Sequence, residues 1–71
     1  MDTTQWVRRY ASELGVEALG DDDVDAVLAL AGVAAHASER TAAPIACWLA
    51  GTTGLSSAEA LAAAKRVEQQ A

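Results

Sequence analysis

The sequence has few of the residues that build disulfide-bonded or metal-held structures. Its 71 residues include one cysteine, Cys47, and one histidine, His36. A single cysteine forms no internal disulfide, which fits a reducing, cytoplasmic location. One His and one Cys are also too few for a structural zinc site without unusual help from carboxylates. We therefore expect no metal centre and no cofactor.

Basic residues are scarce as well. Five Lys and Arg stand against ten Asp and Glu, so the net charge is −5. Proteins that bind nucleic acids gain much of their affinity from cationic side chains that displace counterions from the phosphates. The sequence therefore predicts no nucleic-acid partner.

Long apolar runs are absent, and the most apolar stretch is Val24–Ala35. Each of its positions is apolar or Gly except Asp25. The stretch is shorter than the roughly 20 residues that a membrane-spanning helix needs, so we expect no membrane partner. A helix that is apolar nearly all round packs against neighbours on several sides. The sequence predicts a central helix here, with Leu28 buried and Gly32 allowing another helix to approach closely.

A first helix is predicted over Thr3–Leu14. Asp2 and Gln5 have the spacing of a reciprocal capping box, and Gly15 is placed to end the helix in a left-handed conformation. The apolar stripe expected to face the core consists of Trp6, Val7, Tyr10 and Leu14.

The second and third helices are predicted from charge and proline signals. Acidic residues at 21–25 suit a helix N-terminus, where unpaired backbone N–H groups and the helix dipole favour carboxylates. We expect this helix to end near Arg40, because Pro44 lacks an N–H and its ring clashes with a preceding helical turn. Thr41 is then the predicted cap of a third helix that has Pro44 in its first turn and closes at Gly51.

A fourth helix is predicted over residues 57–69, opened by a capping box of Ser56 and Glu59. The residues expected to face inward are Ala60, Leu61, Ala64 and Val67. Strand-like alternation is absent. Residues 1–71 are therefore predicted to form one all-α domain, a small four-helix bundle with an apolar central second helix.

His36, Glu39 and Arg40 form the one cluster of functional type near the central stretch. Their spacing predicts that the three side chains share one surface of a helix. A His beside a carboxylate suits general-base chemistry, but Cys47 has no basic side chain nearby in sequence that would activate it as a nucleophile. We therefore assign no catalytic residue. The alternative is a small-molecule binder or minor enzyme in which Arg40 contacts a phosphate or carboxylate.

The segment AHASERTAAPIACWLAG, with a Trp-containing first helix ending in Leu-Gly, resembles an uncharacterised family of small, Ala-rich actinobacterial domains. Their turn reads Ala-His-x-x-Glu-Arg-x-Ala-Ala-Pro, and the matching residues here are His36, Glu39, Arg40, Ala42, Ala43 and Pro44. Members of the family occur alone or joined to nucleotidyltransferase domains similar to molybdenum cofactor guanylyltransferases. The resemblance implies an accessory part in molybdenum cofactor maturation and transfers no catalytic residue.

The sequence therefore favours a non-enzymatic protein-interaction or accessory module in the cytoplasm, with a molybdenum cofactor nucleotidyltransferase as the leading partner. The candidate contact residues are His36, Glu39, Arg40, Pro44 and Trp48. Arg40 has two alternative roles: an ion pair with Glu13 or Glu59 that ties helices together, or a contact with a partner. A weak homodimer through exposed apolar positions of the second or third helix is a further expectation, since small domains often complete their cores by association.

Overall fold

The computed structural model describes residues 1–70 and is all-α, as predicted. No strand occurs within these residues. The helices are α1 (Thr3–Leu14), α2 (Asp21–Ala37), α3 (Ala42–Gly51) and α4 (Ser57–Gln70).

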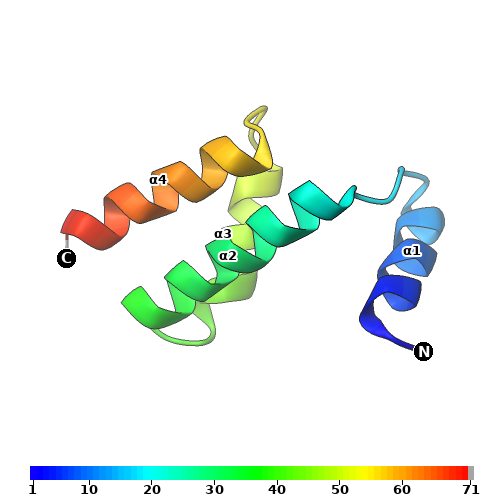
Figure 1. The fold of residues 1–71 in the computed structure, drawn as a ribbon, viewed down its shortest axis with the longest axis horizontal. Helices are drawn as coiled ribbons and strands as arrows, with labels where there is room; N and C mark the ends of the chain where they lie inside the picture. The colour runs from blue at the N-terminus through cyan, green and yellow to red at the C-terminus, as the bar shows by residue number, and fades with distance from the viewer. Residues whose placement is uncertain (71) are drawn as a thin grey trace.

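The second helix is central, as the apolar stretch predicted. It packs against both α3 and α4, and α3 returns from the end of α2 to the start of α4 (Figure 1). Helix α1 lies beyond the N-terminal end of α2, apart from this three-helix unit (Figure 1). The small helical bundle is thus formed mainly by α2, α3 and α4.

Helix α1 begins and ends as its local signals predicted. The N–H of Gln5 donates to Asp2 Oδ1 at 2.8 Å, and the N–H of Asp2 donates to Gln5 Oε1 at 3.1 Å, which completes the capping box. Gly15 has φ 76°, and the N–H of Val16 then donates to the carbonyl oxygen of Ala11 at 3.0 Å. A residue with a Cβ would be strained at this left-handed position.

The predicted burial of the α1 stripe is wrong. Trp6, Tyr10 and Leu14 are exposed, and Val7 is half-buried. The buried residue of the helix is Ala11, over which the chain folds back at its C-terminal turn. The stripe has the periodicity of a core face, but α1 lies apart from the three packed helices (Figure 1), and of the stripe only Val7 is partly covered, by the segment that leads into α2.

Helix α2 starts at Asp21 with an acidic first turn, as predicted, but it ends at Ala37 and not near Arg40. Ser38 leaves the helical conformation with φ −133° and ψ −108°. The N–H of Ala42 donates to the carbonyl oxygen of Glu39 at 2.8 Å, which closes a tight turn into α3. The helix stops early because this turn needs the residues that would otherwise form its last turn.

Thr41 occupies the N-cap position of α3, but its predicted side-chain capping bond is not formed. Its backbone is already helical, with φ −68° and ψ −17°, whereas a capping side chain requires an extended N-cap. Pro44 lies in the first turn of α3, where its missing N–H costs little.

The predicted burial of Leu28 is wrong, and the buried leucine of α2 is Leu30. Leu30 is 5% exposed, whereas Leu28 is 63% exposed. A Cβ added at Gly32 would meet nothing within 4 Å, so the expected close approach of another helix is also wrong. Because α2 is apolar on nearly all sides, its pattern does not specify which line of side chains is covered.

Helix α4 opens with the predicted capping box: the N–H of Ser56 donates to Glu59 Oε1 at 2.9 Å, and the N–H of Glu59 donates to Ser56 Oγ at 3.1 Å. The helix runs one residue further than predicted, to Gln70. Ala60 is buried, and Leu61 and Ala64 are half-buried. Val67 is exposed, against the prediction, because the covered part of α4 ends before the turn that carries it.

Candidate functional site

Helix α3 has two apolar sides, and the packing covers one of them. No residue of Ala42–Gly51 is charged. Cys47 and Ala50 are half-buried, and Cys47 Sγ lies 4.0 Å from the carbonyl oxygen of Val27 on α2. These contacts direct that side of α3 into the bundle.

The opposite side of α3 faces solvent and is formed by Pro44, Ile45, Trp48 and Leu49, which we call the α3 face. Trp48 is 75% exposed, and Ile45 and Leu49 are each exposed by more than half. Most exposed apolar residues of folded proteins are scattered, whereas a contiguous apolar patch marks an interaction surface. The α3 face is therefore a candidate functional site, and it contains two of the predicted contact residues, Pro44 and Trp48.

The other three predicted contact residues are exposed at the end of the bundle where α2 turns into α3. His36 lies in the last turn of α2, and Glu39 and Arg40 lie in the connecting turn. The prediction that the three share one helical surface is wrong, because α2 ends at Ala37. Their exposure leaves them free to contact another molecule.

The structural role considered for Arg40 is not supported within residues 1–70. Its side chain is exposed, and it forms no ion pair with Glu13 or Glu59 there. Glu59 instead accepts the N–H of Ser56, and this hydrogen bond is the main cause of a pKa for its carboxyl below the ordinary value. The bond stabilises the charged form of Glu59. This carboxylate therefore caps the start of α4 and does not pair with Arg40.

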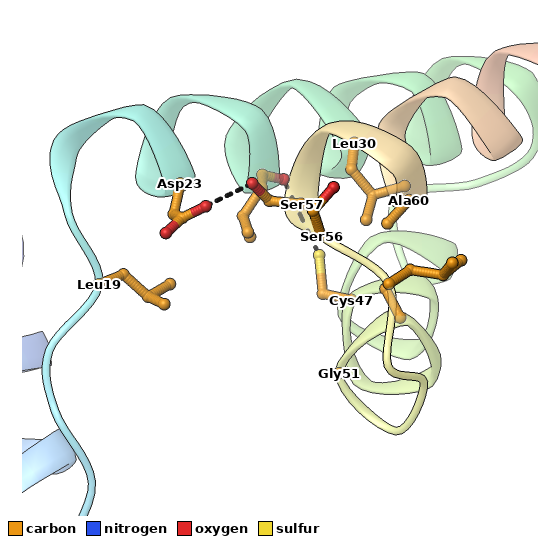
Figure 2. A pocket seen from close by; sticks show the side chains of 11 residues that line it. Leu19, Asp23, Leu30, Cys47, Gly51, Ser56, Ser57 and Ala60 are labelled. Carbon is orange, nitrogen blue, oxygen red and sulfur yellow. Dashed lines mark hydrogen bonds between the residues drawn. The ribbon is translucent and has the colours of Figure 1, made fainter.

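A cavity of about 460 Å³ lies between α2, α3 and the start of α4 (Figure 2). Leu30 and Ala60 line it from the core, and Leu19 lines it from the segment that leads into α2 (Figure 2). The full lining is Leu19, Asp23, Val27, Leu30, Cys47, Ala50, Gly51, Leu55, Ser56, Ser57 and Ala60.

Three polar side-chain atoms of the cavity, Ser57 Oγ, Asp23 Oδ1 and Ser56 Oγ, are engaged within the chain. Ser57 Oγ donates to Asp23 Oδ1 at 2.6 Å, which joins the starts of α4 and α2 (Figure 2). Ser56 Oγ accepts the N–H of Glu59. His36, the one imidazole of the chain, does not line the cavity. The cavity therefore suits apolar side chains better than acid–base chemistry.

Sequence reasoning missed this cavity, because its walls come from three segments, residues 19–30, 47–51 and 55–60, that meet only when the helices pack. A usable signal was present in Leu19 and Leu55, large apolar residues placed in connecting segments just before helices. Both are about half exposed at the rim. Across residues 1–70, no group of three or more His, Cys, Asp or Glu side chains is arranged to hold a metal ion.

The exposed area of the chain is large for its mass. It is 5596 Å², whereas a compact monomer of 7.3 kDa exposes about 4,200 Å². The radius of gyration is 12.6 Å, against about 11 Å for a compact chain of this length. Ala11, Leu30 and Ala60 are the buried apolar residues in the described chain. Much apolar surface is thus left for contact with another molecule.

In the described part of the chain, no helix has the length and apolar character required to cross a membrane. Residues 1–71 match the family model "Domain of unknown function (DUF6457)", and the chain therefore belongs to this family. The expectation of an uncharacterised family is confirmed. Neither the curated proteins nor the solved structures gave a match.

Proposed function

We propose, taking membership in this family as the premise, that the chain is a non-enzymatic protein-interaction module that docks through the α3 face. The observation that carries the proposal is an uncharged helix with Ile45, Trp48 and Leu49 exposed along its outer side. Exposed Trp side chains at the centre of apolar patches are frequent hot spots of binding. Trp48 is therefore the proposed anchor.

The proposed partner is a cytoplasmic protein with an apolar groove that receives Ile45, Trp48 and Leu49. A polar rim surrounds the apolar centre of a typical interface. Glu39 and Arg40, exposed in the turn that leads into α3, are the proposed part of that rim. Arg40 suits a carboxylate on the partner, and Glu39 suits a cation. His36 lies in the last turn of α2, before the turn that carries Glu39 and Arg40.

The leading candidate for the partner is a molybdenum cofactor nucleotidyltransferase. Its support is the resemblance of the turn that carries His36, Glu39, Arg40 and Pro44. The docking role of the α3 face does not depend on this identification, because it rests on the apolar surface itself.

The small-molecule alternative has less geometric support. It needs His36, Glu39 and Arg40 to converge on one ligand, whereas the end of α2 separates His36 from the turn that carries the other two. None of the three lines the cavity between the helices. We therefore retain the hypothesis of a protein-interaction module.

The test is titration calorimetry of the full chain with the purified molybdenum cofactor nucleotidyltransferase of the same genome. Trp48→Ala should weaken binding at least about tenfold, since truncating a hot-spot side chain costs about 2 kcal/mol or more. Arg40→Ala, at the rim, should weaken binding less and make it less dependent on salt.

The matched control is Val67→Ala, because Val67 is also exposed but lies on α4. It should leave affinity unchanged. Equal affinity of the wild-type chain and Trp48→Ala would refute docking through the α3 face. Absence of binding at about 100 μM would refute the nucleotidyltransferase as the partner.

A further inference from the structure

Helix α1 carries a second exposed apolar surface. The rings of Trp6 and Tyr10 stack with centroids 5.2 Å apart and an interplanar angle of 26°. Both side chains are about half exposed, and with Met1 and Arg9 they line a shallow hollow on the outside of α1. The two rings form one rigid aromatic plate, which binds with little loss of side-chain entropy.

Trp6 and Tyr10 do not line the chain's own cavity. Gly15 reverses the chain in a left-handed conformation, and the hydrogen bond from Val16 to Ala11 fixes the reversal. Val7 and Arg8 line a hollow together with Asp21 of the α2 N-terminus, on another side of α1. The aromatic plate is therefore presented to another molecule.

The unburied area is sufficient for a stable dimer. The chain exposes about 1,400 Å² more than a compact monomer of its mass. A standard protein interface buries about 800 Å² on each partner. One further chain can therefore cover the excess, and a closed two-fold dimer covers it equally on both copies.

The aromatic surface of α1 and the cavity carry charges of opposite sign. Arg9 lines the hollow with Trp6 and Tyr10, whereas Asp23, whose Oδ1 also accepts the hydrogen bond from Ser57 Oγ, lines the cavity. Asp21 and Asp22 precede Asp23 in the first turn of α2, so the N-terminal end of this helix is acidic. A basic residue beside an aromatic plate thus matches an acidic residue beside an apolar cavity.

We propose that the chain forms a reciprocal homodimer in which α1 of each copy enters the cavity of the other. Trp6 and Tyr10 then contact Leu30 and Ala60 at the cavity wall, and Arg9 faces Asp23. Both complementary surfaces belong to one chain, so a second copy supplies both contacts at once. This inference goes beyond the proposed function and uses a different surface, because Trp48 does not line the cavity.

The first test is sedimentation equilibrium of the full chain from 1 μM to 1 mM. The wild-type chain should dimerise, and Trp6→Ala should raise the dimer dissociation constant at least about tenfold. Trp48→Ala is the matched control and should leave dimerisation unchanged. A monomer at 1 mM, or a dimer lost in Trp48→Ala and kept in Trp6→Ala, overturns the proposal.

The second test separates exchange between copies from closure of α1 on its own chain. Arg9→Glu and Asp23→Lys should each weaken dimerisation, because each variant places like charges together at both contacts. An equimolar mixture of the two variants should form a heterodimer, since each of its contacts pairs opposite charges. Circular dichroism of each variant checks that its helices are intact.

Rescue in the mixture supports the reciprocal dimer. A third sample carries Arg9→Glu and Asp23→Lys in the same chain. If the mixture stays monomeric and this double variant alone regains a compact shape as a monomer, α1 closes on its own cavity and the proposal is overturned. Docking of the nucleotidyltransferase through Trp48 is scored separately, so either proposal can fail without the other.

Discussion

Helices α1 and α4 begin with the same local device and have different surroundings. Each starts with a capping box, Asp2 with Gln5 and Ser56 with Glu59. Helix α4 then packs along α2, whereas α1 lies apart and exposes its apolar stripe. The comparison teaches that capping defines where a helix begins, but a covering surface decides whether the helix contributes to the core.

The largest expected effect lies in the packed region and comes from Leu30→Ala. Removing this buried side chain should lower the free energy of unfolding by about 2–5 kcal/mol, through lost burial and the cavity left behind. Leu28→Ala is the matched control on the same helix, and its effect should stay within about 0.5 kcal/mol because Leu28 is exposed. Urea unfolding followed by circular dichroism measures both. Equal losses would mean that the covered face of α2 is misassigned.

Two glycine substitutions should have opposite signs. Gly15→Ala places a Cβ at φ 76° and should destabilise the end of α1 by about 1 kcal/mol. Gly32→Ala should stabilise α2 by about 0.5–1 kcal/mol, since Ala has the better helix propensity and the added Cβ meets nothing within 4 Å.

Hydrogen exchange of α1 amides reports on Gly15→Ala, and the urea midpoint reports on Gly32→Ala. A midpoint lowered by Gly32→Ala would show that another helix approaches α2 at this position after all.

The two capping boxes provide the sharpest form of the comparison. Ser56→Ala and Asp2→Ala each remove a capping acceptor worth about 1 kcal/mol to its helix. Ser56→Ala should lower the midpoint of global unfolding, because α4 is packed on α2. At protein concentrations below the dimer dissociation constant, Asp2→Ala should increase amide hydrogen exchange in α1. It should leave the midpoint of global unfolding unchanged. A midpoint shifted equally by both would mean that α1 unfolds together with the bundle.

The smallest expected effect is a pH dependence from Glu59. Its pKa is lowered in the folded chain by the hydrogen bond from the Ser56 N–H, so the stabilisation is present above the ordinary glutamate range. It is lost as the pH falls through the lowered value. Glu59→Gln keeps an acceptor for the Ser56 N–H and removes the titration, so the stability of this variant should depend less on acidic pH. Superimposable pH profiles would contradict the assignment.

The sequence alone determined the helices and most of their ends. The Asp2 and Ser56 capping boxes, the Gly15 terminus and the first-turn position of Pro44 are all as predicted. These signals succeed because the groups that satisfy a helix end lie within a few residues of it in the chain. The turn after α2 is the exception, since the meeting of two helices sets its length.

Tertiary structure alone decided which apolar residues are buried. The helical period places Leu28 and Leu30 on different sides of α2, and a helix apolar on nearly all sides gives no preference between them; the positions of α3 and α4 select Leu30. The Trp6 and Tyr10 stripe has a core period with no covering helix, and the outer side of α3 is as apolar as its inner side. The cavity between α2, α3 and α4 likewise exists only after those helices pack. Burial is a relation between distant segments, so a local pattern specifies which residues are able to be buried, and packing specifies which ones are.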